Sequence, residues 1–156
     1  MASSFLLFYV MDHQVLMPGI TYSATLNQLN WGTQYMGTIH TGDNDGYSWG
    51  DKHEITSWLS YQWQPWISTS ARIAYKHEQQ IDGIDSRIMG PVQTANPDNY
   101  GGDTVTMNFG FNLAGQTRFT RGHRLAFEAG IPLHQDLNGL QMETDLVLTA
   151  GWQYAY

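Results

Sequence analysis

The chain has 156 residues, of which 13% are charged and 13% are aromatic, and its formal net charge is −7. The charge argues against nucleic acid as a partner, because neutralising phosphates requires a basic surface that 7 Lys and Arg residues do not supply. The absence of cysteine excludes disulfides, thiol catalysis and zinc-thiolate sites.

Segments with a period of two follow one another along the chain, and no helical period competes with them. The longest apolar run, residues 5–11, is shorter than the roughly 20 residues that a membrane-spanning helix needs. We expect eight strands, at residues 4–11, 19–28, 31–40, 53–63, 67–77, 103–114, 123–134 and 142–156.

This alternation is what lipid on one side and a polar lumen on the other require of each strand in a transmembrane barrel, and an even strand count suits an up-and-down barrel. We therefore predict an all-β, antiparallel, up-and-down transmembrane β-barrel, formed by residues 1–156 as one domain. Trp58 interrupts the alternation of its strand.

The expected connections differ in length at the two ends of the barrel. The segments near residues 12–17, 41–50, 77–102 and 136–140 would lie at one end, and those near 28–30, 64–66 and 115–122 at the other. Outer-membrane barrels have short periplasmic turns and longer outer loops, so the pattern places Tyr156 at the periplasmic rim. The predicted location is the outer membrane of a Gram-negative-type bacterium, with its lipid as a partner.

Aromatic residues gather near both expected rims, where Trp and Tyr favour the membrane interfaces. The outer rim would carry Tyr47, Trp49, Tyr75 and Tyr100. The periplasmic girdle would consist of Trp31, Trp63, Trp66, Trp152, Tyr154 and Tyr156.

Several stretches carry a family resemblance. The clearest is Gly130-Ile131-Pro132-Leu133-His134-Gln135-Asp136-Leu137-Asn138-Gly139, which runs on through Glu143-Thr144-Asp145 to Gly151-Trp152-Gln153-Tyr154; others are residues 18–22, 42–47, 91–97 and 122–126. Together they resemble the C-terminal portion of the outer-membrane transporter family named for the MetA pathway of phenol degradation. The resemblance implies an outer-membrane β-barrel that is longer at its N-terminus, so this chain would correspond to the C-terminal part of a longer barrel. Its eight strands would close alone or associate with other copies in a wider pore. It implies no catalytic residues.

Charged residues on the polar faces of the expected strands are candidates for the lumen. They are Arg72, Lys76, Arg124, Glu128, Glu143 and Asp145. In a narrow barrel, opposite charges would pair and fill the lumen. The alternative is a charged constriction that selects solutes, which requires a wider lumen.

No metal site, cofactor or catalytic residue is predicted. Asp43-Asn44-Asp45-Gly46 partly matches a calcium loop but lacks the later bidentate Glu, so we interpret it as a solvated loop tip. Met36 and His40 share a face without a second ligand group. Acidic residues and His134 near the C-terminus lack a placed Ser nucleophile, so we do not expect an enzyme.

The predicted function is passage or binding of small solutes by a porin or transporter, with the resemblance suggesting hydrophobic or aromatic ones. One alternative is a non-conducting structural or interaction barrel with a plugged lumen. Another is a soluble lipocalin-like barrel, with apolar residues inside and polar residues outside. A homo-oligomer is compatible with each of the membrane hypotheses.

Overall fold

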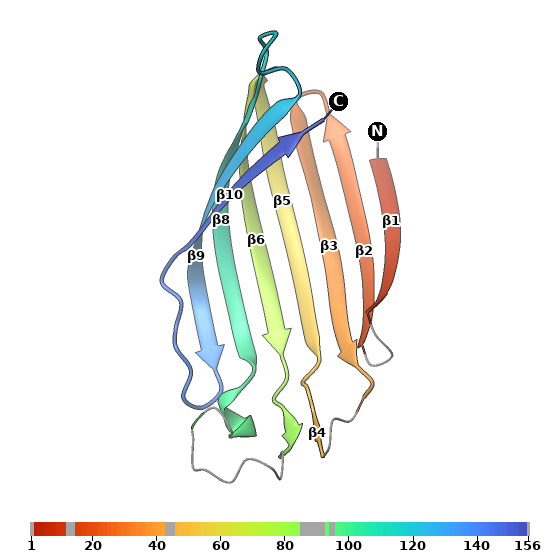
Figure 1. The fold of residues 1–156 in the computed structure, drawn as a ribbon, viewed down its shortest axis with the longest axis vertical. Helices are drawn as coiled ribbons and strands as arrows, with labels where there is room; N and C mark the ends of the chain where they lie inside the picture. The colour runs from red at the N-terminus through yellow and green to blue at the C-terminus, as the bar shows by residue number, and fades with distance from the viewer. Residues whose placement is uncertain (1, 12–14, 43–45, 85–92, 94–95, 156) are drawn as a thin grey trace.

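The structure, a computed structural model, describes residues 2–11, 15–42, 46–84, 93 and 96–155; for residues 5–11 it describes the backbone alone. An eight-stranded antiparallel sheet has the order β1-β2-β3-β5-β6-β8-β9-β10. These strands are β1 (Ala2–Met11), β2 (Val15–Leu26), β3 (Leu29–His40), β5 (Lys52–Gln64), β6 (Ile67–Glu78), β8 (Gly102–Ala114), β9 (His123–Leu137) and β10 (Val147–Tyr154). The eight predicted strands and their up-and-down order are thus confirmed (Figure 1).

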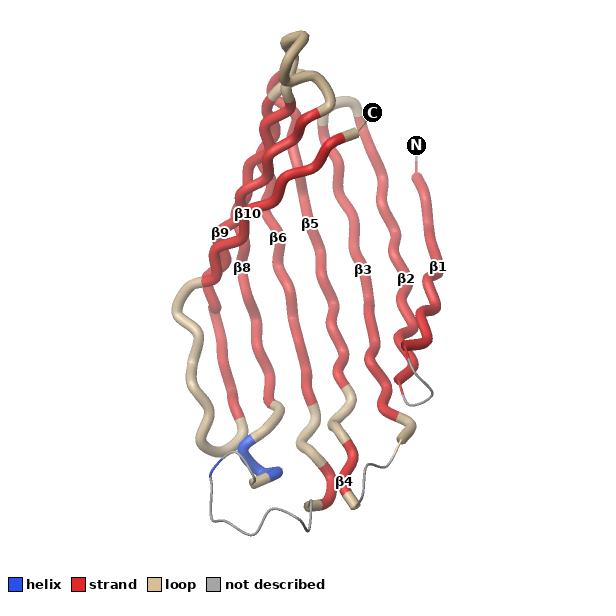
Figure 2. The backbone as a smooth tube through the Cα atoms, in the orientation of Figure 1, coloured by secondary structure: helices blue, strands red, loops and turns tan. Residues whose placement is uncertain are grey.

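Two short strands, β4 (Tyr47–Ser48) and β7 (Asp82–Gly83), pair in a second sheet that the sequence analysis did not predict. One 3-10 helical turn, η2 (Pro97–Asn99), lies at the same end of the molecule (Figure 2). No helix in the described ranges is long and apolar enough to cross a membrane.

The two ends of the main sheet differ in their connections. At one end, called the turn end, two-residue turns join β2 to β3 and β5 to β6, and residues 115–122 join β8 to β9. Asn27 begins the first turn with a φ of 56°, a conformation that Asn tolerates better than most residues. The opposite end, called the loop end, carries β4, β7 and η2, while both chain termini lie at the turn end (Figure 1).

The sheet is curved but not closed, which corrects the prediction of a barrel complete within this chain. Consecutive strands pair with long, regular registers, yet no pairing links β1 to β10 among the described residues. Each of these two strands has one edge without a neighbour.

The last strand is shorter than predicted, because β10 begins at Val147 and not at residue 142. Its pairing with β9 ends at Gly130, and continuing the same register would place Asp145 opposite Pro132. Proline has no N–H to donate, and the neighbouring register shift at Val105/Thr106 distorts the ladder further.

The side-chain amide of Gln135 replaces the missing ladder. It donates to the Thr144 carbonyl oxygen at 3.1 Å and accepts from the Thr144 N–H at 3.0 Å. The segment before β10 is therefore attached to β9 through a side chain rather than through strand pairing.

The sheet has one apolar and one polar face, and the apolar face is the exposed one. No hydrophobic side chain is buried among those described, whereas Thr56 and Asn108 are 7% and 5% exposed; glycines are the other buried residues. The exposed apolar face carries Ile20, Tyr22, Leu26, Trp31, Ile55, Leu59, Tyr61, Ile73, Tyr75, Phe109, Phe111, Leu125, Phe127, Ile131, Leu148 and Trp152. This partition is the reverse of that in an ordinary water-soluble domain.

Candidate functional site

The concave face of the sheet is polar. Among its described residues, one cavity lies near the middle of the strands and another lies at the turn end. The middle cavity has a volume of about 290 Å³ and is lined by Glu54, Arg72, Lys76 and Asn108, among others. Strand pairing places Glu54 directly opposite Lys76, and Arg72 directly opposite Asn108. We treat this polar concave face as the candidate functional site.

Arg72 and Glu128 form the central ion pair of the concave face. The guanidinium contacts both carboxylate oxygens of Glu128, with Nε donating to Oε2 at 3.3 Å. Their side chains are 35% and 27% exposed, so the pair lies between the fully buried and fully solvated cases. Two of the predicted lumen residues are thus brought together across β6, β8 and β9.

On the concave face, glycines lie opposite large side chains and leave room for them. A Cβ added at Gly32 would lie 2.4 Å from the ring of Trp58, which is the paired residue on β5. The indole N–H of Trp58 donates to Asn30 Oδ1 at 3.2 Å. Trp58 therefore occupies the polar face by lying over a glycine and bonding to an amide, which explains the break in the alternation.

Asn108 repeats this arrangement. A Cβ at its pairing partner Gly130 would lie 2.2 Å from Asn108 Oδ1. The amide of Asn108 also reaches the Arg72 carbonyl oxygen at 3.5 Å, at the limit of a hydrogen bond. The buried Asn108 side chain therefore lies against Gly130 on one neighbouring strand and reaches the backbone of Arg72 on the other.

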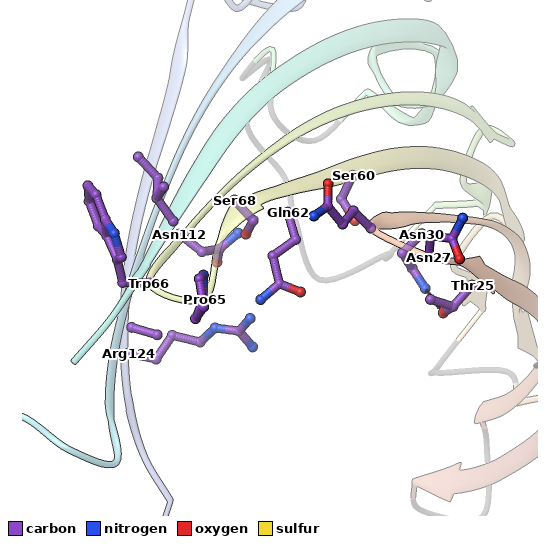
Figure 3. A pocket seen from close by; sticks show the side chains of 13 residues that line it. Thr25, Asn27, Asn30, Ser60, Gln62, Pro65, Trp66, Ser68, Asn112 and Arg124 are labelled. Atoms are coloured by element: carbon purple, nitrogen blue, oxygen red, sulfur yellow. Dashed lines mark hydrogen bonds between the residues drawn. The ribbon is translucent and has the colours of Figure 1, made fainter. Parts of the chain in front are cut away.

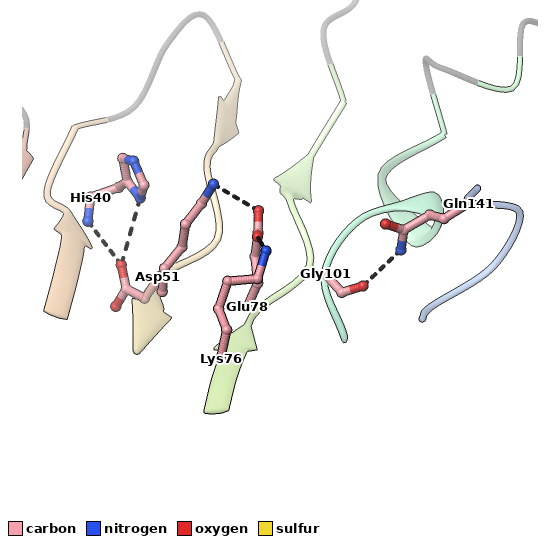
Figure 4. A network of polar contacts seen from close by, with 7 residues as sticks. His40, Asp51, Lys76, Glu78, Gly101 and Gln141 are labelled. Atoms are coloured by element: carbon pink, nitrogen blue, oxygen red, sulfur yellow. Dashed lines mark hydrogen bonds and ion pairs between the residues drawn. The ribbon is translucent and has the colours of Figure 1, made fainter. Parts of the chain in front are cut away.

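A second group of charges lies at the loop end (Figure 4). The carboxylate of Glu78 contacts Lys52 Nζ at 2.9 Å and Lys76 Nζ at 3.2 Å. Partial burial acts to raise the pKa of Glu78, but the two ammonium groups outweigh it and hold this pKa below its ordinary value. Lys76, a predicted lumen residue, thus shares Glu78 with a residue that the sequence analysis did not single out.

His40 and Asp51 lie beside this group. The His40 backbone N–H donates to Asp51 Oδ1 at 2.8 Å, while the ring Nδ1 is 4.0 Å from the same oxygen and makes no hydrogen bond to any described residue (Figure 4). Met36 shares the polar face with His40, but no group of three or more His, Asp or Glu residues in the described ranges is arranged to hold a metal ion. Of the predicted loop tip, residues 43–45 lie outside the described residues.

Arg124 lies apart from the other predicted lumen residues, in the cavity at the turn end. Glu143 and Asp145 are exposed and precede β10, and neither forms an ion pair within the described residues. The predicted pairing of opposite charges in the lumen is therefore not observed for Arg124, Glu143 or Asp145 within the described residues.

The predicted periplasmic girdle lies at the turn end, on exposed positions. Its described members, Trp31, Trp63, Trp66, Trp152 and Tyr154, are between 42% and 67% exposed. Indole N–H groups find partners there: Trp63 donates to Thr69 Oγ1 at 2.9 Å, and Trp152 bonds to the His123 ring at 3.1 Å. Tyr156 lies outside the described residues.

Three aromatic residues of the predicted outer rim form a cluster at the loop end. Trp49 makes edge contacts with Tyr47 and Tyr100, at ring-centroid distances of 6.2 and 6.4 Å. The cluster thereby joins the segment that contains β4 to the segment that follows η2.

The sequence analysis did not single out several polar residues of the concave face. Glu54, Glu78 and Asn108 are ordinary strand residues by their sequence context, and only the pairing of distant strands shows their neighbours. Gln62 and Asn112 at the turn end belong to the same group. Their position on the polar side of the alternation was the available signal.

Comparisons with models of protein families, with curated proteins and with solved structures find no match to this chain.

Proposed function

We propose that this chain forms wall strands of a transmembrane β-barrel in a bacterial outer membrane, and that small solutes pass along its polar concave face. The observation that carries the proposal is the reversed partition of side chains: the convex face is apolar and exposed, while ion pairs, amides and hydroxyls line the concave face. Lipid is the environment that makes this partition favourable.

The strand lengths support the proposal. A tilted strand crosses the hydrocarbon core with about 9–11 residues. The strands β2, β3 and β6 have 12 residues each, and β5 and β8 have 13. They are long enough to cross and to carry aromatic residues at both ends.

The stagger of the strands also suits a barrel wall. Following directly paired residues across the sheet leads from Ala2, the first residue of β1, through Trp31 and Ala71 to Leu148, near the start of β10. The strands β1 and β10 run in opposite directions, so β1 begins at the turn end and β10 ends there. The line of paired residues therefore starts at the turn end of β1 and reaches β10 near the end that lies away from the turns. Such a shift accompanies the strand tilt that barrel closure requires.

The free edges of β1 and β10 must then be covered, since unpaired backbone groups are costly in lipid. Pairing β10 with β1 keeps the antiparallel alternation, either within one chain or between two copies. Further strands of a longer chain, as the MetA-pathway family resemblance implies, would complete the wall in the same way.

The polarity of the concave face distinguishes the two alternative functions, the lipocalin-like barrel and the plugged barrel. A lipocalin-like barrel would place its apolar residues on the concave face, where this sheet places ions and amides. The plugged barrel is favoured by one observation, the mutual neutralisation of Arg72 and Glu128 in the middle of the face. It therefore stays the second candidate.

Two measurements test the proposal. The chain is refolded into detergent micelles and examined for a heat-dependent gel shift, then reconstituted in planar bilayers. We expect a shift and discrete conductance steps whose ion selectivity changes in Arg72→Ala and not in Arg118→Ala, an exposed arginine in the turn segment. Soluble monomers without detergent contradict the membrane assignment, and a shift without conductance favours the plugged barrel.

A further inference from the structure

The turn-end cavity differs in charge from the rest of the molecule. It has a volume of about 300 Å³, and its lining contains Arg124 but no Asp or Glu. The whole chain, by contrast, contains 14 acidic residues and 7 basic ones. A cavity with one cation and no anion is therefore a local exception that favours a negatively charged ligand.

Arg124 is available to such a ligand. Its side chain extends into the hollow beneath the curved sheet, as does that of Gln62 (Figure 3). No ion pair or side-chain hydrogen bond engages Arg124 in the part of the chain that the structure describes, whereas Arg72 is held by Glu128. A guanidinium stays charged at all relevant pH values and offers a carboxylate two parallel donors.

Neutral polar side chains lie next to Arg124 in a row. Gln62 on β5 pairs with Ser68 on β6, which in turn pairs with Asn112 on β8. Within the described residues these three side chains make no hydrogen bond, while Asn30 across the cavity is occupied by Thr25 and Trp58. The row thus presents free amide and hydroxyl groups to whatever occupies the cavity.

We propose that the turn-end cavity binds small hydroxylated carboxylates, with Arg124 holding the carboxylate and the row of Gln62, Ser68 and Asn112 bonding the hydroxyls. The volume lies at the small end of ligand sites, so a single sugar acid fits better than an oligomer. This inference deepens the proposed function by naming a solute class for the same concave face, but binding itself does not require conduction.

The test is calorimetric titration of the refolded full chain in non-ionic detergent, with gluconate as the probe and glucose as its neutral counterpart. We expect gluconate to bind and Arg124→Gln to weaken it about ten- to hundredfold, as loss of a charged hydrogen-bonding partner does. Arg118→Gln, which removes the same charge outside the cavity, should leave gluconate affinity unchanged. Asn112→Leu should weaken gluconate more than acetate, because acetate has no hydroxyls.

The site is refuted if the wild-type chain binds gluconate no better than glucose, or if Arg118→Gln weakens it as much as Arg124→Gln. Circular dichroism and the heat-dependent gel shift of each variant verify that folding is retained. Gluconate binding without conductance would overturn the transport function and keep the site. Conductance without gluconate binding would overturn the site alone.

Discussion

The proposed contact of the apolar face with lipid can be tested at Ile73. This residue lies in the middle of β6, pairs with Ser57 and Met107, and is 45% exposed on the convex face. An arginine at the middle of the lipid-facing surface of a barrel costs about 2–4 kcal/mol, falling to about 0–1 near the interfaces. If that face met water, an exposed substitution would change stability by only about 0.5 kcal/mol.

We therefore expect Ile73→Arg to lower the free energy of unfolding by about 2–4 kcal/mol, a roughly 30- to 700-fold change in the folding equilibrium. The assay is urea unfolding of the chain refolded in phosphatidylcholine vesicles, followed by tryptophan fluorescence. Leu26→Arg, at the turn end, and Ala74→Arg, on the concave face beside Ile73, serve as controls and should cost less. Equal losses at Ile73 and Leu26, or no loss at Ile73, would refute the reasoning.

Three further predictions concern the polar face. Gly32→Val should destabilise the fold by about 1–3 kcal/mol in chemical unfolding, since its Cβ would meet Trp58 at 2.4 Å and the Tyr22 carbonyl oxygen at 2.7 Å; unchanged stability would contradict this packing. Arg72→Met should cost about 1–3 kcal/mol by leaving Glu128 unpaired, and Arg72→Met/Glu128→Leu should recover part of the loss; a double variant no better than the single one argues against the pair. Because its folded pKa is lowered, Glu78 contributes stability above the ordinary glutamate value of 4.5 and loses it as the pH falls below that value. Glu78→Gln should therefore flatten the acid side of a stability–pH curve, with Glu143→Gln as the exposed control, and parallel curves would exclude the contribution.

The alternation of side chains was sufficient to predict the eight strands of the main sheet and their order, but not β4 and β7. In β8, apolar Val105, Met107 and Phe109 alternate with Thr104, Thr106 and Asn108, and pairing of consecutive strands is the simplest topology for such a series. The start of β10 was missed although its cause, Pro132, is visible in the sequence. The alternation of residues 142–146 predicts a strand, but pairing in the register of β10 would place Asp145 opposite Pro132, which has no N–H to donate.

The neighbours within the candidate site could not be predicted, because they depend on the register of strands far apart in the chain. Arg72 and Glu128 are both polar-face residues by alternation, but their contact requires the pairings of β6 with β8 and of β8 with β9 to be known. Trp58 was recognised as an exception without its explanation, since Gly32 lies on another strand. The openness of the sheet is likewise a property of the two edge strands and not of their side-chain pattern.

The lack of a buried apolar side chain in the described structure also determines how stability should vary with temperature. Unfolding of an ordinary domain raises the heat capacity by about 12–15 cal/mol/K per residue, mainly because apolar surface becomes hydrated. In this sheet the apolar side chains lie on the outside, so under the proposed function lipid and not the protein shields them from water. Unfolding that leaves these side chains in lipid or detergent should then give a free energy that changes nearly linearly with temperature, whereas unfolding into water should keep the curvature that produces cold denaturation.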